Sequence, residues 1–364
     1  MATKLNICSE PWQKWFDNSG EKLFIAGPCS AESEEQMLST ANGLKNANVS
    51  IFRAGIWKPR TRPNTFEGVG FKGLQWLKRV KEETGLRTAT EVANVKHVYE
   101  CLKAGVDVLW IGARTTVNPF AVQEIAEALR GVDTVVLVKN PINPDIELWI
   151  GALERFSAVG ITKLGAIHRG FSFYEKAKFR NPPQWEIPIE LKRRLPHMPL
   201  ISDPSHICGN REGLADIAQK AMDLNFDGLI IESHVDPDKA WSDASQQITP
   251  KVLLELLDKL ILRHETDSHL INPFDEIRAQ IDRDDEALVN LLGHRMKLAE
   301  QIGEQKKVSN ITILQSSRWN EILEKRIEQG NQNNLGKEFI TKIFEEIHKE
   351  SIEKQMRIMN EAAV

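Results

Sequence analysis

Six basic side chains stand at or just after short apolar runs of this chain. They are Arg53, Lys58, Arg60, Arg114, Lys139 and Arg169. Where such runs are parallel strands of one barrel, their carboxyl ends meet at one rim, and six like charges there repel one another unless anions bind. Any one of the six could instead cap a loop or pair with a nearby acid. Taken together, they predict polyanionic ligands, most simply two phosphorylated small molecules.

Potential metal ligands follow the same pattern. Cys29, His206 and Glu232 lie at or just after the ends of the first, seventh and eighth runs, and Asp243 follows the eighth. A thiol, an imidazole and two carboxylates suit a divalent transition metal, with no preference among Mn, Fe, Co and Zn. Their spacing forms no local motif, so a buried free thiol and a core histidine are the alternative interpretation.

Two kinds of segment alternate along residues 1–262, and together they must position these side chains. Between the apolar runs lie segments with helical periodicity, and eight such units predict a (β/α)8 barrel. A doubly wound open sheet is the alternative, but no G-x-G-x-x-G follows the first run. The expected strands are 23–26, 51–54, 87–91, 108–112, 135–139, 163–168, 200–203 and 229–232. The expected helices are 33–47, 70–84, 96–104, 119–129, 145–159, 211–224 and 250–260.

Beyond about residue 265 the strand pattern ends. Residues 263–272 form a polar linker, and residues 273–364 are expected to be entirely helical. Asn272-Pro273 is expected to start a helix of about 35 residues, with further helices at 313–328 and 336–359 and a polar turn at 329–334. One helix this long has too little chain beside it to cover its apolar stripe, which predicts a helical bundle that forms an intertwined dimer.

Composition excludes several classes of protein. The 364 residues carry a formal charge of −4, which offers no basic footprint for nucleic acid. The apolar runs are far shorter than the roughly 20 residues of a membrane span, and no apolar signal segment precedes them. Four cysteines without a CxxC pair suggest free thiols in a reducing compartment, so we expect a cytoplasmic protein.

Polar side chains also recur along the helical region. They are Arg278, Arg295, Lys306, Arg318, Ser351 and Gln355. Arg295 and Lys306 are eleven helical steps apart and differ by about 20°, so they share a face, whereas Arg278 is about 100° away. Ser351 and Gln355 are i,i+4 neighbours. A solvated charged helix is the usual explanation of such charges and stays open at this point.

The barrel motifs together resemble the 3-deoxy-D-arabino-heptulosonate 7-phosphate (DAHP) synthases, in the compact bacterial branch related to 3-deoxy-octulosonate 8-phosphate synthase. The motifs are GPCS at 27–30, FRAG at 52–55, KPRTRP at 58–63, TEV at 90–92, GAR at 112–114, KNP at 139–141, HRG at 168–170, DPSH at 203–206 and IIESH at 230–234. The KPRT loop separates the chain from the octulosonate enzymes. Cys29 favours the metal-dependent form.

This resemblance implies a reaction of phosphoenolpyruvate with erythrose 4-phosphate. One divalent metal per barrel would be held by Cys29, His206, Glu232 and Asp243; we expect Mn, with Fe, Co or Zn as alternatives. Arg114, Lys139 and Arg169 would bind the phosphate of phosphoenolpyruvate, with Ala113 in the same substrate-binding set and Arg53 and Lys58 near the carboxylate. Arg60 and Thr61 would bind the phosphate of erythrose 4-phosphate, and Glu91 would position the attacking water.

Residues 272–360 resemble the all-helical type II chorismate mutases through IRAQID at 277–282, LLGHRMKLAEQIGEQK at 291–306 and ESIEKQ at 350–355. The resemblance implies that Arg295 and Arg318 bind the two carboxylates of chorismate, with Ser351 in the same site, while Arg278 reaches the site of the other subunit. Lys306 and Gln355 would contact the ether oxygen. Gln315 replaces a usual Asp, and Trp319 replaces a Glu that helps hold the substrate hydroxyl. We still expect an active mutase.

Three interpretations follow. The first is a bifunctional enzyme of the shikimate pathway with both activities. In the second, the barrel is a DAHP synthase and the helical region is only a dimerising, ligand-sensing module. The third is a barrel that uses another sugar phosphate, such as arabinose 5-phosphate. Because the linker joins an early and a later step of one pathway, we expect prephenate or chorismate to regulate the barrel; no separate amino-acid-sensing domain is expected.

Overall fold

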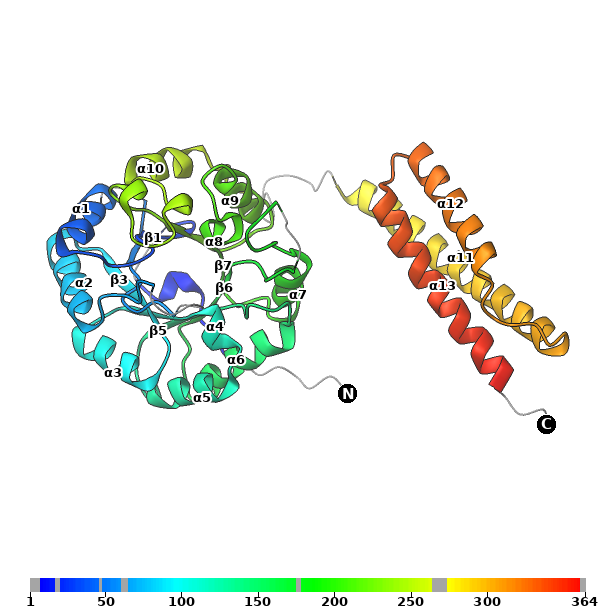
Figure 1. Cartoon of the computed structure of the whole chain (residues 1–364), viewed down its shortest axis with the longest axis horizontal. Helices are drawn as coiled ribbons and strands as arrows, with labels where there is room; N and C mark the ends of the chain where they lie inside the picture. Colours follow the sequence, from blue (N-terminus) through cyan, green and yellow to red (C-terminus); the bar gives the residue numbers. More distant parts are fainter. Residues whose placement is uncertain are drawn as a thin grey trace. The chain divides into compact units, whose positions relative to one another are not determined.

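The computed structural model describes residues 7–16, 20–45, 48–59, 65–174, 178–263 and 274–360. The chain divides into two compact units, Met1–Glu265 and Thr266–Val364 (Figure 1). Apart from Arg263, the linker expected at 263–272 lies outside the described residues. No helix in the described ranges is both long and apolar enough to cross a membrane.

The first unit is a closed barrel of eight parallel strands, each paired with the next, with the last paired to the first (Figure 1). Ile25 in the first strand pairs with Ile51 on one side and Ile230 on the other, which closes the ring. The expected (β/α)8 barrel is therefore confirmed, and the open-sheet alternative is wrong. The strands are β1 Leu23–Gly27, β2 Ile51–Arg53, β3 Arg87–Val92, β4 Val108–Ile111, β5 Val135–Lys139, β6 Leu164–His168, β7 Leu200–Ser202 and β8 Gly228–Glu232.

Helices surround this barrel. The longer ones are α1 Glu34–Leu44, α2 Phe71–Thr84, α3 Val95–Ala104, α5 Pro119–Ala128, α6 Ile146–Ala158, α7 Glu186–Arg194, α9 Leu214–Asp223 and α10 Pro250–Lys259. Helix α7 was not predicted from the sequence, nor were the short helices α4 (Ala113–Thr116) and α8 (Pro204–Cys208). The short helices span too few residues to show a period, and α7 ends in three consecutive basic residues that mask its apolar face.

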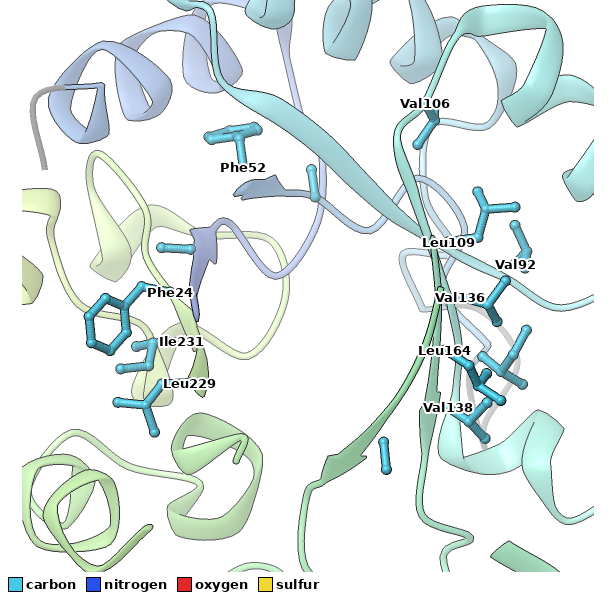
Figure 2. Close-up of a cluster of buried hydrophobic side chains, with 14 of the residues drawn as sticks. Phe24, Phe52, Val92, Val106, Leu109, Val136, Val138, Leu164, Leu229 and Ile231 are labelled. Carbon is cyan, nitrogen blue, oxygen red and sulfur yellow. The ribbon is translucent and has the colours of Figure 1, made fainter. Parts of the chain in front are cut away.

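Side chains along each strand alternate between two cores. Outward-facing residues pack against the surrounding helices, as Phe24, Phe52 and Leu229 do in Figure 2. Inward-facing residues such as Leu23 and Ile25 form a second cluster inside the barrel. The buried Trp12 and Trp15, from the N-terminal turn η1 (Trp12–Lys14) and the residue after it, belong to this inner cluster. The amino-terminal half of the interior is therefore apolar and filled, which leaves the carboxyl-terminal end for polar groups.

The second unit consists of three helices: α11 Asp275–Val308, α12 Ser316–Gln332 and α13 Lys337–Asn360. The expected long helix is confirmed at 34 residues, although Asn272 and Pro273, its expected start, lie outside the described residues. The expected turn at 329–334 is partly wrong because α12 continues to Gln332. Gly330 explains the continuation: a Cβ there would lie 2.5 Å from Ile340, so the missing side chain lets α13 pack directly on the last turn of α12.

This helical unit has almost no core of its own. Within the described residues 274–360, Ala299 and Ile340 are the only hydrophobic side chains that are buried. Large apolar side chains remain exposed on α11, on α13 and in the segments that flank α11, among them Phe274, Ile277, Ile281, Leu288, Val289, Leu291, Leu298, Ile302, Leu314, Phe339 and Met356. A unit of this size needs a larger buried apolar area to be stable.

Candidate active sites

The polar end of the barrel is built by the last inward-facing residue of several strands. Arg53, Glu91, Lys139 and Glu232 occupy this position in β2, β3, β5 and β8, and Asp203 directly follows β7. Because strand side chains alternate, the residue two positions earlier in each of the four strands faces the apolar inner cluster or its edge. The sequence therefore places a layer of charged side chains next to the apolar interior of the barrel. His168, which ends β6, faces outward instead and packs against Phe171 and Trp185.

A cavity of about 370 Å³ opens at this end. Four of the six predicted cations line it: Lys58, Arg114, Lys139 and Arg169. The remaining lining residues are Pro59, Thr65, Glu91, Ala113, Ile142, Arg180, His206 and Asp243. Arg60 and Thr61, which directly follow Pro59, lie outside the described residues. The cavity therefore combines a majority of positive charge with carboxylates and an imidazole.

Arg53 does not line the cavity but lies buried beside it. Its Nη2 is 3.2 Å from Glu232 Oε1 and donates a hydrogen bond to the carbonyl oxygen of Cys29 at 3.4 Å. Its Nε and Nη1 are buried and have no hydrogen-bond partner among the described residues. Arg53 therefore supports the Glu232 carboxylate and keeps two donors available.

Two of the other cations, Lys139 and Arg169, are held in place by their neighbours. Lys139 Nζ lies 2.7 Å from Asp203 Oδ2, and both side chains are buried. Arg169 Nη1 donates to Asn181 Oδ1 at 2.8 Å. Burial lowers the pKa of Arg169 to about 10, so the guanidinium remains charged near neutral pH. Fixed, buried or half-buried cations of this kind are pre-organised for anionic ligands.

The four predicted metal ligands lie together as two contacting pairs. Cys29 Sγ is 3.2 Å from Asp243 Oδ2, and His206 Nε2 is 3.7 Å from Glu232 Oε1. Cations contact both carboxylates and the thiol: Lys58 Nζ is 3.0 Å from Cys29 Sγ, and Arg180 Nη1 is 2.8 Å from Asp243 Oδ1. Among the residues that the structure describes, no group of three His, Cys, Asp or Glu side chains is arranged to hold a metal as it stands.

The chemistry of this donor set nevertheless fits a divalent transition metal, because thiolate, imidazole and carboxylate are its usual ligands. Gln246 donates to Glu232 Oε2 at 2.6 Å, which leaves Oε1 buried without a hydrogen bond from any described residue. Asp243 has a φ of +47°, a conformation that is uncommon outside glycine and concentrates at functional sites. Burial, followed by the charge of Glu232, raises the pKa of Cys29 to about 12, so the thiol keeps its proton until a cation stabilises the thiolate.

Two residues of this site, Trp110 and Arg180, were not predicted from the sequence. Trp110 Nε1 donates to Glu91 Oε2 at 2.9 Å, and its ring lies 4.9 Å from the Arg53 guanidinium and 5.9 Å from Lys139 Nζ. Trp110 thus orients Glu91 and contacts two cations from inside the barrel. Its inward-facing position in β4 could have identified Trp110 from the sequence. No such position marks Arg180, because Arg180 does not directly follow a strand.

The helical unit brings some of its predicted residues together. Arg295 Nη1 donates to Ser351 Oγ at 2.6 Å, and Ser351 and Gln355 are both buried. Lys306 Nζ donates to the carbonyl oxygen of Ile313 at 2.6 Å. Burial lowers the pKa of both Arg295 and Lys306.

The other two predicted arginines of this unit are more exposed. Arg318 lines a cavity of about 570 Å³ together with Arg295, and its Nη1 lies 2.7 Å from Glu321 Oε2. Arg278 lies near the start of α11, 3.7 Å from Asp275. The unit therefore offers two arginines at one cavity and places Arg278 elsewhere on its surface.

Comparisons with known proteins identify both units. A sequence model of the DAHP synthetase I family matches residues 10–268, and a model of chorismate mutase type II matches residues 277–356. The chain is 31% identical over 242 residues to a phospho-2-dehydro-3-deoxyheptonate aldolase of Thermotoga maritima, covering 66% of this chain and 70% of that protein. It is 28% identical over 256 residues to a 2-dehydro-3-deoxyphosphooctonate aldolase of Legionella pneumophila, covering 65% of this chain and 90% of that one.

Solved structures agree with this assignment. The crystal structure of the Thermotoga maritima DAHP synthase matches with a TM-score of 0.59 at 30% identity, over 66% of this chain and 68% of that one. A truncated form of the same enzyme matches with a TM-score of 0.58 at 28% identity, over 66% and 85% of the two chains. The chain belongs to the DAHP synthetase I family and carries a type II chorismate mutase domain after its barrel, which makes it a bifunctional enzyme of the shikimate pathway.

Proposed function

We propose that the barrel joins phosphoenolpyruvate to erythrose 4-phosphate with release of phosphate, and that the helical unit rearranges chorismate to prephenate. The observation that carries the first reaction is the cavity lined by Lys58, Arg114, Lys139 and Arg169 beside the thiol, imidazole and carboxylate donors. Two anionic substrates need this excess of fixed positive charge. Assays of both reactions on one preparation test the proposal.

In the barrel, Arg114, Lys139 and Arg169 bind the phosphate of phosphoenolpyruvate and stabilise it as it departs. Lys58, which lines the cavity with Ala113, and the buried Arg53 beside it would lie toward its carboxylate. Carbon 3 of phosphoenolpyruvate attacks the aldehyde, and water adds at carbon 2. Glu91, held by Trp110, positions that water. Arg60 and Thr61, which lie outside the described residues and follow the cavity-lining Pro59 in the sequence, would bind the phosphate of erythrose 4-phosphate.

Cys29, His206, Glu232 and Asp243 would hold one divalent metal, for which we propose manganese. When bound, it supplies a Lewis acid for the aldehyde oxygen. Support comes from the donor types and from the buried Glu232 Oε1, which accepts no hydrogen bond from a described residue although it lies 3.2 Å from Arg53 Nη2. The four free thiols of the chain suit the reducing cytoplasm in which we place the enzyme.

In the helical unit, Arg295 and Arg318 would bind the two carboxylates of chorismate, with Ser351 fixing Arg295. Lys306 and Gln355 would stabilise the negative charge that develops on the ether oxygen as its C–O bond breaks. This rearrangement requires no nucleophile or metal, only pre-organised shape and charge. Gln355 would stabilise that charge through its Nε2 amide group, because its Oε1, which is buried and has no hydrogen-bond partner among the described residues, can only accept.

We also propose that the helical unit forms a homodimer, because a single copy leaves its apolar side chains exposed. Ile281, half exposed on α11, lies near Arg278, which would reach the partner's site. We expect Ile281→Asp to give a monomer and to lower mutase activity at least tenfold, since burying a charge at an apolar interface is strongly unfavourable. Light scattering after size exclusion measures the mass, with the exposed Asp285→Ala as a control. A monomeric wild-type protein would contradict the proposal.

Feedback from the helical unit to the barrel is the last part of the proposal. Prephenate, or chorismate, bound at the helical site should change the synthase rate through differential affinity for two arrangements of the chain. Synthase rates measured across a prephenate titration should change severalfold and saturate. Equal rates with and without saturating prephenate would contradict this regulation.

A further inference from the structure

Two aromatic rings meet between α12 and α13 of the helical unit. The rings of Trp319 and His348 are stacked, with centroids 4.0 Å apart and planes at 11°. Trp319 directly follows Arg318 in the first turn of α12. His348 precedes Ser351 by three residues and Gln355 by seven, so the three side chains share one face of α13. The stack therefore borders the proposed mutase site from both helices.

His348 carries a polar atom with nothing to bind. Its Nε2 is buried and has no hydrogen-bond partner among the described residues, which is a rare state for a buried polar atom and one that calls for an explanation. Burial, followed by the positive charges of Arg295 and Lys306, lowers the pKa of His348. The imidazole is therefore neutral near neutral pH, with one nitrogen as a donor and the other as an acceptor.

The polar groups of chorismate can be matched to this site one by one. The molecule has two carboxylates, one ether oxygen and one hydroxyl. Arg295 and Arg318 account for the carboxylates, and Lys306 and Gln355 account for the ether oxygen. The hydroxyl is the remaining group, and Ser351 Oγ is already bound to Arg295 and to the carbonyl oxygen of Ile347.

We propose that His348 Nε2 forms the hydrogen bond to the chorismate hydroxyl and that Trp319, by stacking on the imidazole, positions it. This inference rests on the proposed placement of chorismate in the site. A stacked ring loses rotational freedom, so the nitrogen is held in place before the substrate arrives. His348 is thus a specificity-determining residue, and Trp319 is a positioning residue that acts through it.

A pair of substrates tests this assignment. For His348→Ala, we expect kcat/KM to fall roughly tenfold to hundredfold with chorismate, because a site built for a hydroxyl loses its partner. With an analogue of chorismate that lacks the hydroxyl, the same variant should change by less than about threefold. His348→Gln, whose amide can reach a similar position, should restore part of the preference for chorismate.

Further variants separate this role from a merely structural one. Trp319→Ala should show the same selective loss with chorismate, whereas Trp319→Phe keeps a stacking ring and should retain most of the preference. His294→Ala, an exposed histidine on α11, is the matched control and should leave both substrates unaffected. If His348→Ala proves unstable, the Gln and Phe variants still decide the question.

Two results would overturn the proposal. Equal losses with both substrates in the His348 variants would show that the side chain only supports the fold, and an unchanged rate with chorismate would show that it does not contact the substrate. In either case the wild-type mutase activity itself would stand. Failure of the wild-type protein to convert chorismate would instead overturn the mutase assignment, and this inference with it.

Discussion

Removal of divalent metal by a chelator should lower the synthase activity by about a hundredfold or more and leave mutase turnover unchanged. The proposed ligands all belong to the barrel unit, whereas the rearrangement of chorismate in the helical unit requires shape and charge alone. Both rates are measured on the same preparation before and after chelation. Addition of Mn²⁺ should restore the synthase rate. Full synthase activity in protein shown by elemental analysis to be metal-free would contradict the metal assignment.

Cys29→Ala should reproduce the effect of chelation, and added Mn²⁺ should not reverse it. The side chain is small and wholly buried, so the barrel should still fold, which circular dichroism and thermal unfolding can verify. Cys101→Ala is the matched control, since Cys101 is equally buried but belongs to the outer core on α3. Comparable synthase losses in the two variants would indicate a packing effect and contradict a ligand role for Cys29.

Lys306→Ala should lower mutase kcat/KM by about a hundredfold to a thousandfold, the usual cost of removing one donor to a developing oxyanion. Burial lowers the pKa of Lys306, and among the described residues its Nζ donates to one carbonyl oxygen, that of Ile313, so its remaining N–H groups are available for the ether oxygen. Steady-state loss of chorismate measures the effect.

The neighbouring Lys307→Ala provides the control for this experiment. Lys307 Nζ donates to the carbonyl oxygen of Ile358 and lies outside the proposed site, so its removal should cost mutase activity less than about threefold. Unchanged mutase turnover in Lys306→Ala would contradict the assignment of the ether-oxygen pair.

The barrel could be predicted from sequence because its strands are short, apolar and regularly spaced. The strand Val135–Lys139 was predicted with its observed bounds, and the other strands differ by one residue at one end. Alternation then places Lys139 and Glu232 in the interior at the polar end. Position at a strand end and inward side-chain register together predict most residues of the barrel site.

Contacts between residues far apart in the chain could not be predicted from the sequence. Arg180 comes from the segment before α7, yet its guanidinium reaches Asp243, which lies 63 residues further along the chain. Arg53 was expected at the cavity wall, but its buried pairing with Glu232 depends on the closure of β8 onto β1 and on the side chains that fill the interior. Residue types and local spacing do not determine such contacts.

In the helical unit, too, local features could be predicted from the sequence, whereas long-range contacts could not. The period of α11 and its length follow from the sequence, but the extension of α12 depends on the contact between Gly330 and Ile340. The replacement of an acidic residue by Trp319 was visible in the sequence as a departure from the family. Its pairing with His348, 29 residues away, emerged only from the packing of α12 against α13.

Two assays on one purified preparation test the central claim most directly. One follows the loss of phosphoenolpyruvate with erythrose 4-phosphate or arabinose 5-phosphate as the second substrate, and the other follows the loss of chorismate. We predict that phosphoenolpyruvate is consumed with erythrose 4-phosphate in strong preference to arabinose 5-phosphate and that chorismate is converted to prephenate. Consumption only with arabinose 5-phosphate, or an absence of chorismate turnover, would contradict the account.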